Sequence, residues 1–336
     1  MTRVSKLLIC TQAVDALDPI LGFFHRWIEE FAEHADKVIV LCLRKGTYHL
    51  PSHVEVISLG ERHKLLRALE LCSIAFGRRR EYDTVFVHMN PEYVVAAGWL
   101  WRLLRKRVGL WYVHKMDSWR LRFAARFANT VFSVAPESIP LTGPKVHFLG
   151  HGIDVPTHVN RKQAHALVSI AAVGRIAPIK YLDRMFDVCA VLHTRKVPFI
   201  FSIVGSATNP EEVRYEATLR ARLEGESFAD SVRFVGPLPH KEIPKFLETT
   251  DVLLNLTPTG SFDKVILEAM SVGVTPIICN EAFADAPGVV VVSAEKPELI
   301  ADAIVNRHSE PEALERYVRE NHSLQSLVGR IIRLLS

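Results

Sequence analysis

The chain has 336 residues, of which 49% are hydrophobic and 23% charged, and its formal net charge is +4. This length suits two domains of about 150 residues each, and the composition is that of a folded globular protein, which excludes an intrinsically disordered chain. The five cysteines are scattered, with no Cys-x-x-Cys pair or neighbouring histidine cluster. This pattern argues against a zinc site and a disulfide framework, and it predicts free thiols in a reducing compartment.

The apolar runs are too short for a membrane span, which needs about 18 uninterrupted apolar residues. The first run ends at the polar pair Thr11 and Gln12, and it is typical of a buried strand rather than a signal peptide. We therefore expect a cytoplasmic protein.

The first half of the sequence alternates short apolar runs with amphipathic stretches. The runs predict strands at residues 6–10, 37–43, 54–59, 84–88, 108–113, 130–134 and 145–149. The amphipathic stretches predict helices at residues 20–35, 64–76, 93–104 and 118–128. Such alternation is typical of a parallel sheet covered on both faces, so we expect a Rossmann-like domain over residues 1–155.

A Gly/Pro-rich stretch at residues 150–160 then breaks the rhythm and predicts an interdomain linker. Beyond it the alternation resumes, with strands expected at residues 169–173, 199–204, 232–235, 251–256, 275–279 and 288–292. Helices are expected at residues 181–193, 210–224, 241–248 and 264–271. This pattern predicts a second Rossmann-like domain over residues 156–311, and a terminal helix within residues 312–336 that packs back on the first domain.

Two cations follow the first strand of this second domain. Arg175 and Lys180 lie after Gly174, between the strand's carboxyl end and the next helix. A planar guanidinium, a compact ammonium and free helix N–H groups together suit a diphosphate. Two solvated loop charges are the alternative interpretation.

Further along, two strands end in glycine, which permits tight turns and close approach of a ligand to the backbone. Gly205 ends one strand, and the turn Gly236-Pro237-Leu238 ends the next, where it has the shape to hold a nucleobase or to serve only as a turn.

The stretch 251–273 combines a strand, a Thr/Pro/Gly/Ser loop and a helix. Its loop N–H groups and helix N-terminus favour an anionic phosphate. Glu268 lies one turn inside the helix between apolar neighbours, where a carboxylate needs polar partners, and it is suited to accept both hydrogen bonds of a ribose diol.

These spacings resemble glycosyltransferase family 4 (glycosyl transferases group 1), which has the GT-B fold, two Rossmann-like domains facing each other across a cleft. The matching stretches lie at residues 173–180, 203–205, 232–236 and 251–273. The resemblance is strong over residues 165–285 and collinear over the first half, including residues 111–114 and 152–154.

The resemblance implies a hexosyltransferase that moves a sugar with retention from a nucleoside-diphosphate sugar to a saccharide or lipid-linked acceptor, without a required metal or other cofactor. The implied setting is polysaccharide, lipopolysaccharide or glycolipid synthesis. Arg175 and Lys180 are implied to hold the diphosphate, and His114 to lie near the transferred sugar; these three are the expected catalytic residues. Glu268 is implied to hold the ribose. The expected donor-binding residues are Gly205, Gly236, Pro237, Leu238, Gly260, Ser261, Phe262, Asp263, Lys264 and Glu268.

Two positions depart from the family pattern. Gly260 stands where the first of two glutamates is usual, with Asp263 as the nearest acid, and Tyr181 stands where a glycine usually follows the lysine. On the acceptor side, Gly22 and His88 follow strands of the first domain and are expected to border the acceptor, although a turn and a loop histidine explain them equally well.

Basic charge is concentrated in residues 62–126, which hold 14 Lys and Arg against 5 Asp and Glu. Residues 99–107 place two tryptophans among four basic residues at helical spacing, as an interfacial helix does. We therefore expect peripheral contact with an anionic membrane, on its inner face, rather than with nucleic acid, for which no recognised module is present. An apolar core side with solvated charges is the alternative.

Other functions remain open from the residues alone. A sugar-nucleotide epimerase uses the same fold, and a non-catalytic nucleotide-sugar-binding homologue is consistent with Gly260. A nicotinamide-dependent dehydrogenase is disfavoured, because no Gly-x-Gly-x-x-Gly follows the first strands.

Overall fold

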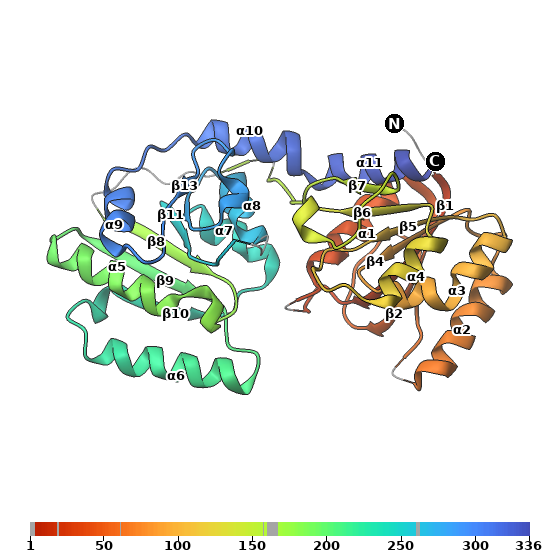
Figure 1. Cartoon of the computed structure of the whole chain (residues 1–336), viewed down its shortest axis with the longest axis horizontal. Helices are drawn as coiled ribbons and strands as arrows, with labels where there is room; N and C mark the ends of the chain where they lie inside the picture. The colour runs from red at the N-terminus through yellow and green to blue at the C-terminus, as the bar shows by residue number, and fades with distance from the viewer. Residues whose placement is uncertain (1–3, 19, 61, 157, 160–166, 260–262) are drawn as a thin grey trace. The chain divides into compact units, whose positions relative to one another are not determined.

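The computed structural model describes residues 4–18, 20–60, 62–156, 158–159, 167–259 and 263–336. Contacts divide the chain into two compact units: Met1–Asp154 with His322–Ser336, and Val155–Asn321. Each unit contains one parallel sheet with helices on both faces, so the two Rossmann-like domains predicted from the sequence are confirmed (Figure 1).

The sheet of the first unit has seven described strands in the order β3-β2-β1-β4-β5-β6-β7, all paired in parallel. The strands are β1 (Val4–Val14), β2 (Ala35–Lys45), β3 (Val54–Ser58), β4 (Thr84–His88), β5 (Arg107–Trp111), β6 (Thr130–Ser133) and β7 (Val146–Phe148). The chain reverses its direction of travel across the sheet between β1 and β4. Ligands of such sheets bind beyond the carboxyl ends of the strands at this reversal.

Helices cover the two faces of this sheet in separate groups. Helices α2 (Lys64–Gly77), α3 (Pro91–Leu103) and α4 (Trp119–Phe127) pack side by side on one face. Helix α1 (Phe23–Glu33) packs with α11 (Leu324–Leu335) on the other. Strand β5 shows the alternation: Val108 and Leu110 join the core under α2–α4, whereas Gly109 lies against Leu335 of α11.

The sheet of the second unit has the order β10-β9-β8-β11-β12-β13 and is again parallel throughout its described strands. The strands are β8 (Val168–Val173), β9 (Phe199–Val204), β10 (Val232–Gly236), β11 (Val252–Asn255), β12 (Thr275–Ile278) and β13 (Val290–Val291). The helices are α5 (Leu182–Thr194), α6 (Pro210–Glu224), α7 (Ile243–Leu247), α8 (Lys264–Ser271), α9 (Pro297–Val305) and α10 (Pro311–His322). Here the reversal lies between β8 and β11, which places their carboxyl ends at the expected ligand position.

Two predicted helices differ from those observed, and one observed helix was not predicted. Helix α1 begins only at Phe23, because the Asp18 carboxylate accepts hydrogen bonds from the N–H groups of Ile20 and Leu21 and holds them in a turn. The terminal helix is divided in two by extended Ser323, whose hydroxyl caps α11 by accepting from the Ser326 N–H. Helix α9 was missed.

The break at Ser323 separates two terminal helices that belong to different units. Helix α10 belongs to the second unit, and α11 belongs to the first. The Ile153 backbone pairs with Ser323 and bonds His322 and Leu324, which fixes the start of α11 beside the end of the first unit's main segment.

Candidate active site

The carboxyl ends of three adjacent strands in the second unit are marked by glycines with positive φ: Gly174 (142°), Gly205 (136°) and Gly236 (85°). A Cβ on Gly205 would lie 1.8 Å from the carbonyl oxygen of Gly174, so no other residue fits there without moving the backbone. The Gly205 N–H in turn donates to the Gly236 carbonyl at 2.9 Å. These three glycines therefore leave the carboxyl ends of the strands free of side chains, at the position where ligands of this fold bind.

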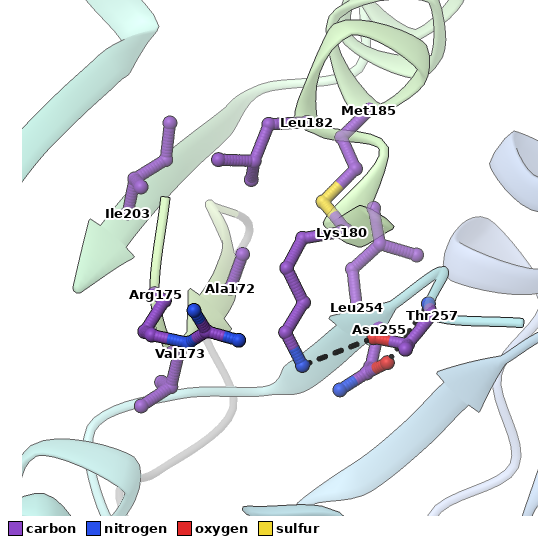
Figure 2. A pocket seen from close by; sticks show the side chains of 11 residues that line it. Ala172, Val173, Arg175, Lys180, Leu182, Met185, Ile203, Leu254, Asn255 and Thr257 are labelled. Carbon is purple, nitrogen blue, oxygen red and sulfur yellow. Dashed lines mark hydrogen bonds between the residues drawn. The ribbon is translucent and has the colours of Figure 1, made fainter. Parts of the chain in front are cut away.

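A small cavity opens beside these glycines, between the ends of β8 and β11 and the start of α5. Figure 2 shows Lys180 extending through the cavity toward Asn255 and Thr257, with Arg175 on its other side. The Lys180 ammonium donates to Thr257 Oγ1 at 3.2 Å and to Asp263 Oδ2 at 2.6 Å. The predicted lysine is thus held at the reversal point of the sheet by groups that follow β11.

Asp263 is the centre of this hydrogen-bond network. Its Oδ2 accepts from Lys180 Nζ, from Asn255 Nδ2 at 2.9 Å and from Thr257 Oγ1 at 2.8 Å. Burial by itself raises the pKa of this carboxyl, but the Lys180 charge and these hydrogen bonds outweigh it and hold the pKa below its usual value. The carboxylate is therefore ionised at neutral pH and faces the lysine.

Arg175 has a different carboxylate partner. Its Nη1 donates to Glu212 Oε1 at 2.6 Å, and Glu212 is buried at the start of α6. The other oxygen of Glu212 accepts from the N–H and the hydroxyl of Thr208, and these hydrogen bonds together with the Arg175 charge lower its pKa. Arg175 remains about half exposed while Glu212 fixes one side of its guanidinium, so its other donors stay accessible.

Helix α8 presents the remaining polar groups. Glu268 is mostly buried, and its Oε1 lies 3.0 Å from Nε2 of His240, which follows β10. Lys264 occupies the first turn of α8. Burial lowers the pKa of Lys264 to about 8, although the Glu268 carboxylate opposes that change. The helix N-terminus therefore combines its own positive end with a lysine whose pKa is lowered to about 8.

The structure brings together most of the donor-site residues expected in the second unit. Arg175, Lys180 and Gly205 gather at the ends of β8 and β9, and Asp263 reaches the same network from the start of α8. Pro237 is exposed and Leu238 half-buried in the turn after β10. Gly260, Ser261 and Phe262 lie outside the described residues.

The expected residues of the first unit have varied environments. His88 is buried at the end of β4, stacked on Phe24 with a ring separation of 4.0 Å, and its Nδ1 lies 3.4 Å from Thr11 Oγ1. Gly22 caps α1 against the Asp18 carbonyl, where a Cβ would lie 2.5 Å from that oxygen. His114 is exposed beyond β5, and its Nδ1 accepts from the Met116 N–H.

Sequence reasoning missed four residues of the second unit's site. Asn255 ends β11 and Thr257 lies two residues beyond it, and that position at a strand's carboxyl end was the signal for them. Glu212 contacts Arg175, and His240 contacts Glu268, only because the tertiary fold brings them together. No spacing in the local sequence predicts either contact. Tyr181, which replaces the usual glycine, adopts a left-handed conformation with φ at 52°. Its ring stacks on the Arg184 guanidinium at 4.3 Å.

The chain is similar to known glycosyltransferases. Residues 168–309 match the family model of glycosyl transferases group 1. The D-inositol 3-phosphate glycosyltransferase of Streptomyces griseus is 29% identical over 163 residues, which cover 45% of this chain and 34% of that protein. The amylovoran biosynthesis glycosyltransferase AmsK of Erwinia amylovora is 28% identical over 146 residues, which cover 41% and 34%. The matches thus span about a third of the length of these curated relatives.

Solved structures give the fold over nearly the whole chain. The lipopolysaccharide outer core galactosyltransferase WaaB in its apo form superposes with a TM-score of 0.67 at 13% identity, covering 98% of this chain and 99% of that one. The pneumococcal O-GlcNAc transferase GtfA, solved with UDP and GlcNAc, superposes with a TM-score of 0.59 at 11% identity, covering 81% and 59%. The second unit therefore resembles the glycosyl transferases group 1, and the chain as a whole has the two-domain GT-B fold of these solved structures.

Proposed function

We propose that the chain transfers a sugar, with retention, from a nucleoside-diphosphate sugar to a saccharide or lipid-linked acceptor in the synthesis of a polysaccharide, lipopolysaccharide or glycolipid. One observation carries the proposal: Lys180 is fixed by Asp263 and Thr257 at the reversal point of the second sheet, beside the accessible donors of Arg175. The relatives named above support the setting, and the UDP bound to GtfA supports the donor class.

The donor's diphosphate would bind between Arg175 and Lys180. As the bond between the sugar and the diphosphate breaks, negative charge grows on the leaving diphosphate, and fixed cations stabilise that charge more than the ground state. Lys264 and the N-terminus of α8 add positive potential on the same side. The sugar carbon passes through a state resembling an oxocarbenium ion, as in other glycosyl chemistry.

The other donor-site residues would bind the nucleoside and orient it. Glu268 would accept hydrogen bonds from the ribose hydroxyls. His240 would then either move away from the Glu268 carboxylate or keep its own hydrogen bond to it. The turn Gly236-Pro237-Leu238 would contact the base. In the first unit, we assign His114 to the transferred sugar or the acceptor, and Gly22 and His88 to the acceptor side; burial of His88 restricts its part to shaping that side.

We further propose that transfer needs no bound metal, because Arg175, Lys180, Lys264 and a helix N-terminus supply the positive charge that the leaving group requires. Excess EDTA is then expected to leave the rate unchanged, and a loss restored by a divalent cation would overturn this part of the proposal. Among the described residues, no group of three or more metal-ligating side chains comes together.

We also propose that the first unit rests on an anionic membrane surface through α2, α3 and α4. Each of these neighbouring helices exposes an apolar pair at i, i+4 spacing: Leu65 and Leu69, Trp99 and Leu103, Trp119 and Phe123. In the sequence, each pair has a basic residue between its members (Arg67, Arg102 and Arg120). Each basic residue would contribute about 1 kcal/mol near anionic lipid. Within the described part of the chain, no helix is both long and apolar enough to cross a bilayer.

Lys106 is less suited to lipid contact than the sequence suggested. Its ammonium donates to the Tyr82 carbonyl and lies over the Tyr82 ring, and its side chain is only 11% exposed. Arg102, Arg105 and Arg107 stay exposed and remain the proposed lipid-facing cations of this segment.

The test is a transfer assay with labelled nucleotide sugars and a membrane extract as the acceptor source. We expect label to enter a glycan or glycolipid from one donor, and nuclear magnetic resonance of the product to show the anomeric configuration of the donor. Isomerised donor formed without acceptor would instead identify an epimerase. A protein that binds the nucleotide without any turnover would contradict the transferase proposal.

A further inference from the structure

A second cavity lies wholly within the first unit, at the carboxyl edge of its sheet. It has a volume of about 360 Å³, within the range of roughly 300–1,000 Å³ that small-molecule sites occupy. Leu43 and Leu59 close it from the ends of β2 and β3, and Ala68, Leu71 and Ala96 close it from α2 and α3. The walls are therefore mainly aliphatic.

Three cations stand at this apolar cavity, against one carboxylate. Lys64 and Arg67 come from the first turn of α2, and Arg120 comes from α4. Glu92 is the acid, and it lies 3.9 Å from Arg120 at the limit of an ion pair. Among the described residues, Lys64 and Arg67 have no carboxylate within 4.0 Å, in contrast to neighbouring Arg62, which pairs with Glu70.

The position of Lys64 and Arg67 is electrostatically unfavourable without a ligand. The first turn of α2 contains no acidic residue, and Lys64 occupies its first position. Cations at a helix N-terminus oppose the helix dipole and destabilise the helix. An anion bound there would remove that cost, because the exposed N–H groups and both side chains would then act on it together.

Asn90 also lines the cavity, as the residue before α3, and its side chain caps no helix N–H. Its Nδ2 atom has no hydrogen-bond partner among the described residues, but it is inaccessible to solvent, so a ligand in the cavity does not reach it. The groups that face an anion in the cavity are therefore Lys64 and Arg67.

The surroundings of the cavity indicate what kind of ligand it suits. Leu65, Leu66 and Leu69 are 69%, 57% and 68% exposed on the same helix that supplies Lys64 and Arg67. The charged side chains of the lining are mostly cations, which suit an anionic group better than the neutral hydroxyls of a sugar or a nucleoside. An amphiphile with an apolar chain and an anionic head satisfies both the aliphatic walls and the unpaired cations.

We infer that this cavity binds a lipid phosphate, with its chain against Leu59 and Leu71 and its phosphate at Lys64 and Arg67. The inference rests on the proposed function and deepens it, because it makes the acceptor of the transfer a phosphate-bearing lipid. It also separates two roles of the first unit: the outer faces of α2–α4 contact the membrane surface, and this cavity takes one lipid molecule from it.

The test is calorimetric titration of the full chain with decyl phosphate below its micelle concentration, alongside inorganic phosphate and decanol. Decyl phosphate is expected to bind at least tenfold more tightly than either. Arg67→Gln should weaken that binding at least tenfold, and so should Ala68→Phe, which fills the cavity. Arg80→Gln, an exposed cation just beyond α2 and outside the cavity, is the matched control and should bind as the unchanged protein does.

Several outcomes would overturn the inference. Equal affinity for inorganic phosphate would show a site for free phosphate, equal affinity for decanol would show apolar binding alone, and equal loss in Arg80→Gln would show unspecific charge attraction. Nucleotide binding is measured on each variant as the check on folding. A protein that binds its nucleotide but not decyl phosphate refutes this inference only, whereas one that binds no nucleotide refutes the proposed function.

As a final check, transfer assays should show that Arg67→Gln raises KM for the lipid acceptor while leaving KM for the donor unchanged. A merely structural role would alter both. An unchanged KM for the acceptor would contradict the inference.

Discussion

Lys180 Nζ and Asp263 Oδ2 lie 2.6 Å apart in a mostly buried ion pair. Asn255 and Thr257 donate to the same carboxylate oxygen, so the pair is fixed by both ends of the β11–α8 connection. Arg175 with Glu212 and His240 with Glu268 form two further pairs in the same unit. Lys180, Arg175 and Glu268 are therefore each held by a partner, and a diphosphate must compete with the carboxylate at Lys180.

This competition gives a prediction for Asp263→Asn. Removing the carboxylate frees Lys180 for the diphosphate, so affinity for the nucleoside diphosphate should rise about tenfold, the size of one charge-assisted hydrogen bond. Thermal stability should fall, because a mostly buried ammonium loses its counter-charge. Lys180→Met, which removes the cation itself, should lose at least tenfold in affinity. If both variants lose affinity equally in calorimetry, Asp263 contacts the donor directly and the competition model is wrong.

Gly205 gives a prediction about the strand edge. Gly205→Ala places a Cβ 1.8 Å from the Gly174 carbonyl oxygen at a φ of 136°, so we expect the second unit to lose about 2–4 kcal/mol of its free energy of unfolding. Gly225→Ala, at a negative φ with 3.6 Å of clearance, is the control and should be nearly neutral. Urea unfolding followed by far-ultraviolet circular dichroism measures the stability of both variants. Equal midpoints for the two variants would contradict the close approach of β8 and β9.

Lys264 predicts how donor binding depends on pH. Its pKa of about 8 lies below the usual lysine value because the side chain is buried. The protonated form attracts the diphosphate, so affinity should be full below pH 8 and decline as the pH rises above it. A nucleotide sugar is the suitable ligand, since its diphosphate does not titrate in that range. Lys264→Gln should bind more weakly at pH 7 and show a flat profile between pH 7 and 9.5. A decline that persists in Lys264→Gln would assign the titration to another group.

The exposed apolar pairs predict membrane contact. Trp99→Ser with Leu103→Ser should reduce flotation with anionic liposomes several-fold, because both side chains lie on the outer face of α3 and are 53% and 72% exposed. Leu299→Ser with Val305→Ser alters two comparably exposed apolar residues of the second unit and should not reduce it. Equal flotation of both double variants and the unchanged protein would remove the proposed membrane surface.

The sequence predicted the fold well because each strand and helix carries its own periodic pattern. Thr84–His88, Pro210–Glu224 and Lys264–Ser271 were located to the residue. Strand β1 runs further than predicted, through Thr11 to Val14, because backbone pairing with β2 extends residues whose side chains give no strand signal. The break at Ser323 was also missed, since the helical pattern continues on both sides of it.

The candidate site was predicted in part, for an equally physical reason. Lys180 and Arg175 follow the carboxyl end of a strand. In a parallel sheet this end lies at the ligand-binding edge, so their position can be predicted from the local sequence alone. Their partners follow from no such rule. Glu212 reaches Arg175 from a helix 37 residues away, and His240 reaches Glu268 across 28 residues, so only the packing of α6 and α8 brings these pairs together.

Nucleotide binding by Glu268→Ala tests the central claim most directly. We expect the unchanged protein to bind one nucleoside diphosphate, UDP or GDP, in calorimetry. Glu268→Ala should bind that diphosphate at least tenfold more weakly. It should bind the corresponding monophosphate more weakly by the same factor, because Glu268 is assigned to the ribose that both nucleotides contain. Lys180→Met should lose affinity for the diphosphate by a much larger factor than for the monophosphate. A protein that binds no nucleoside diphosphate, or a Glu268→Ala variant that binds it unchanged, would contradict the account.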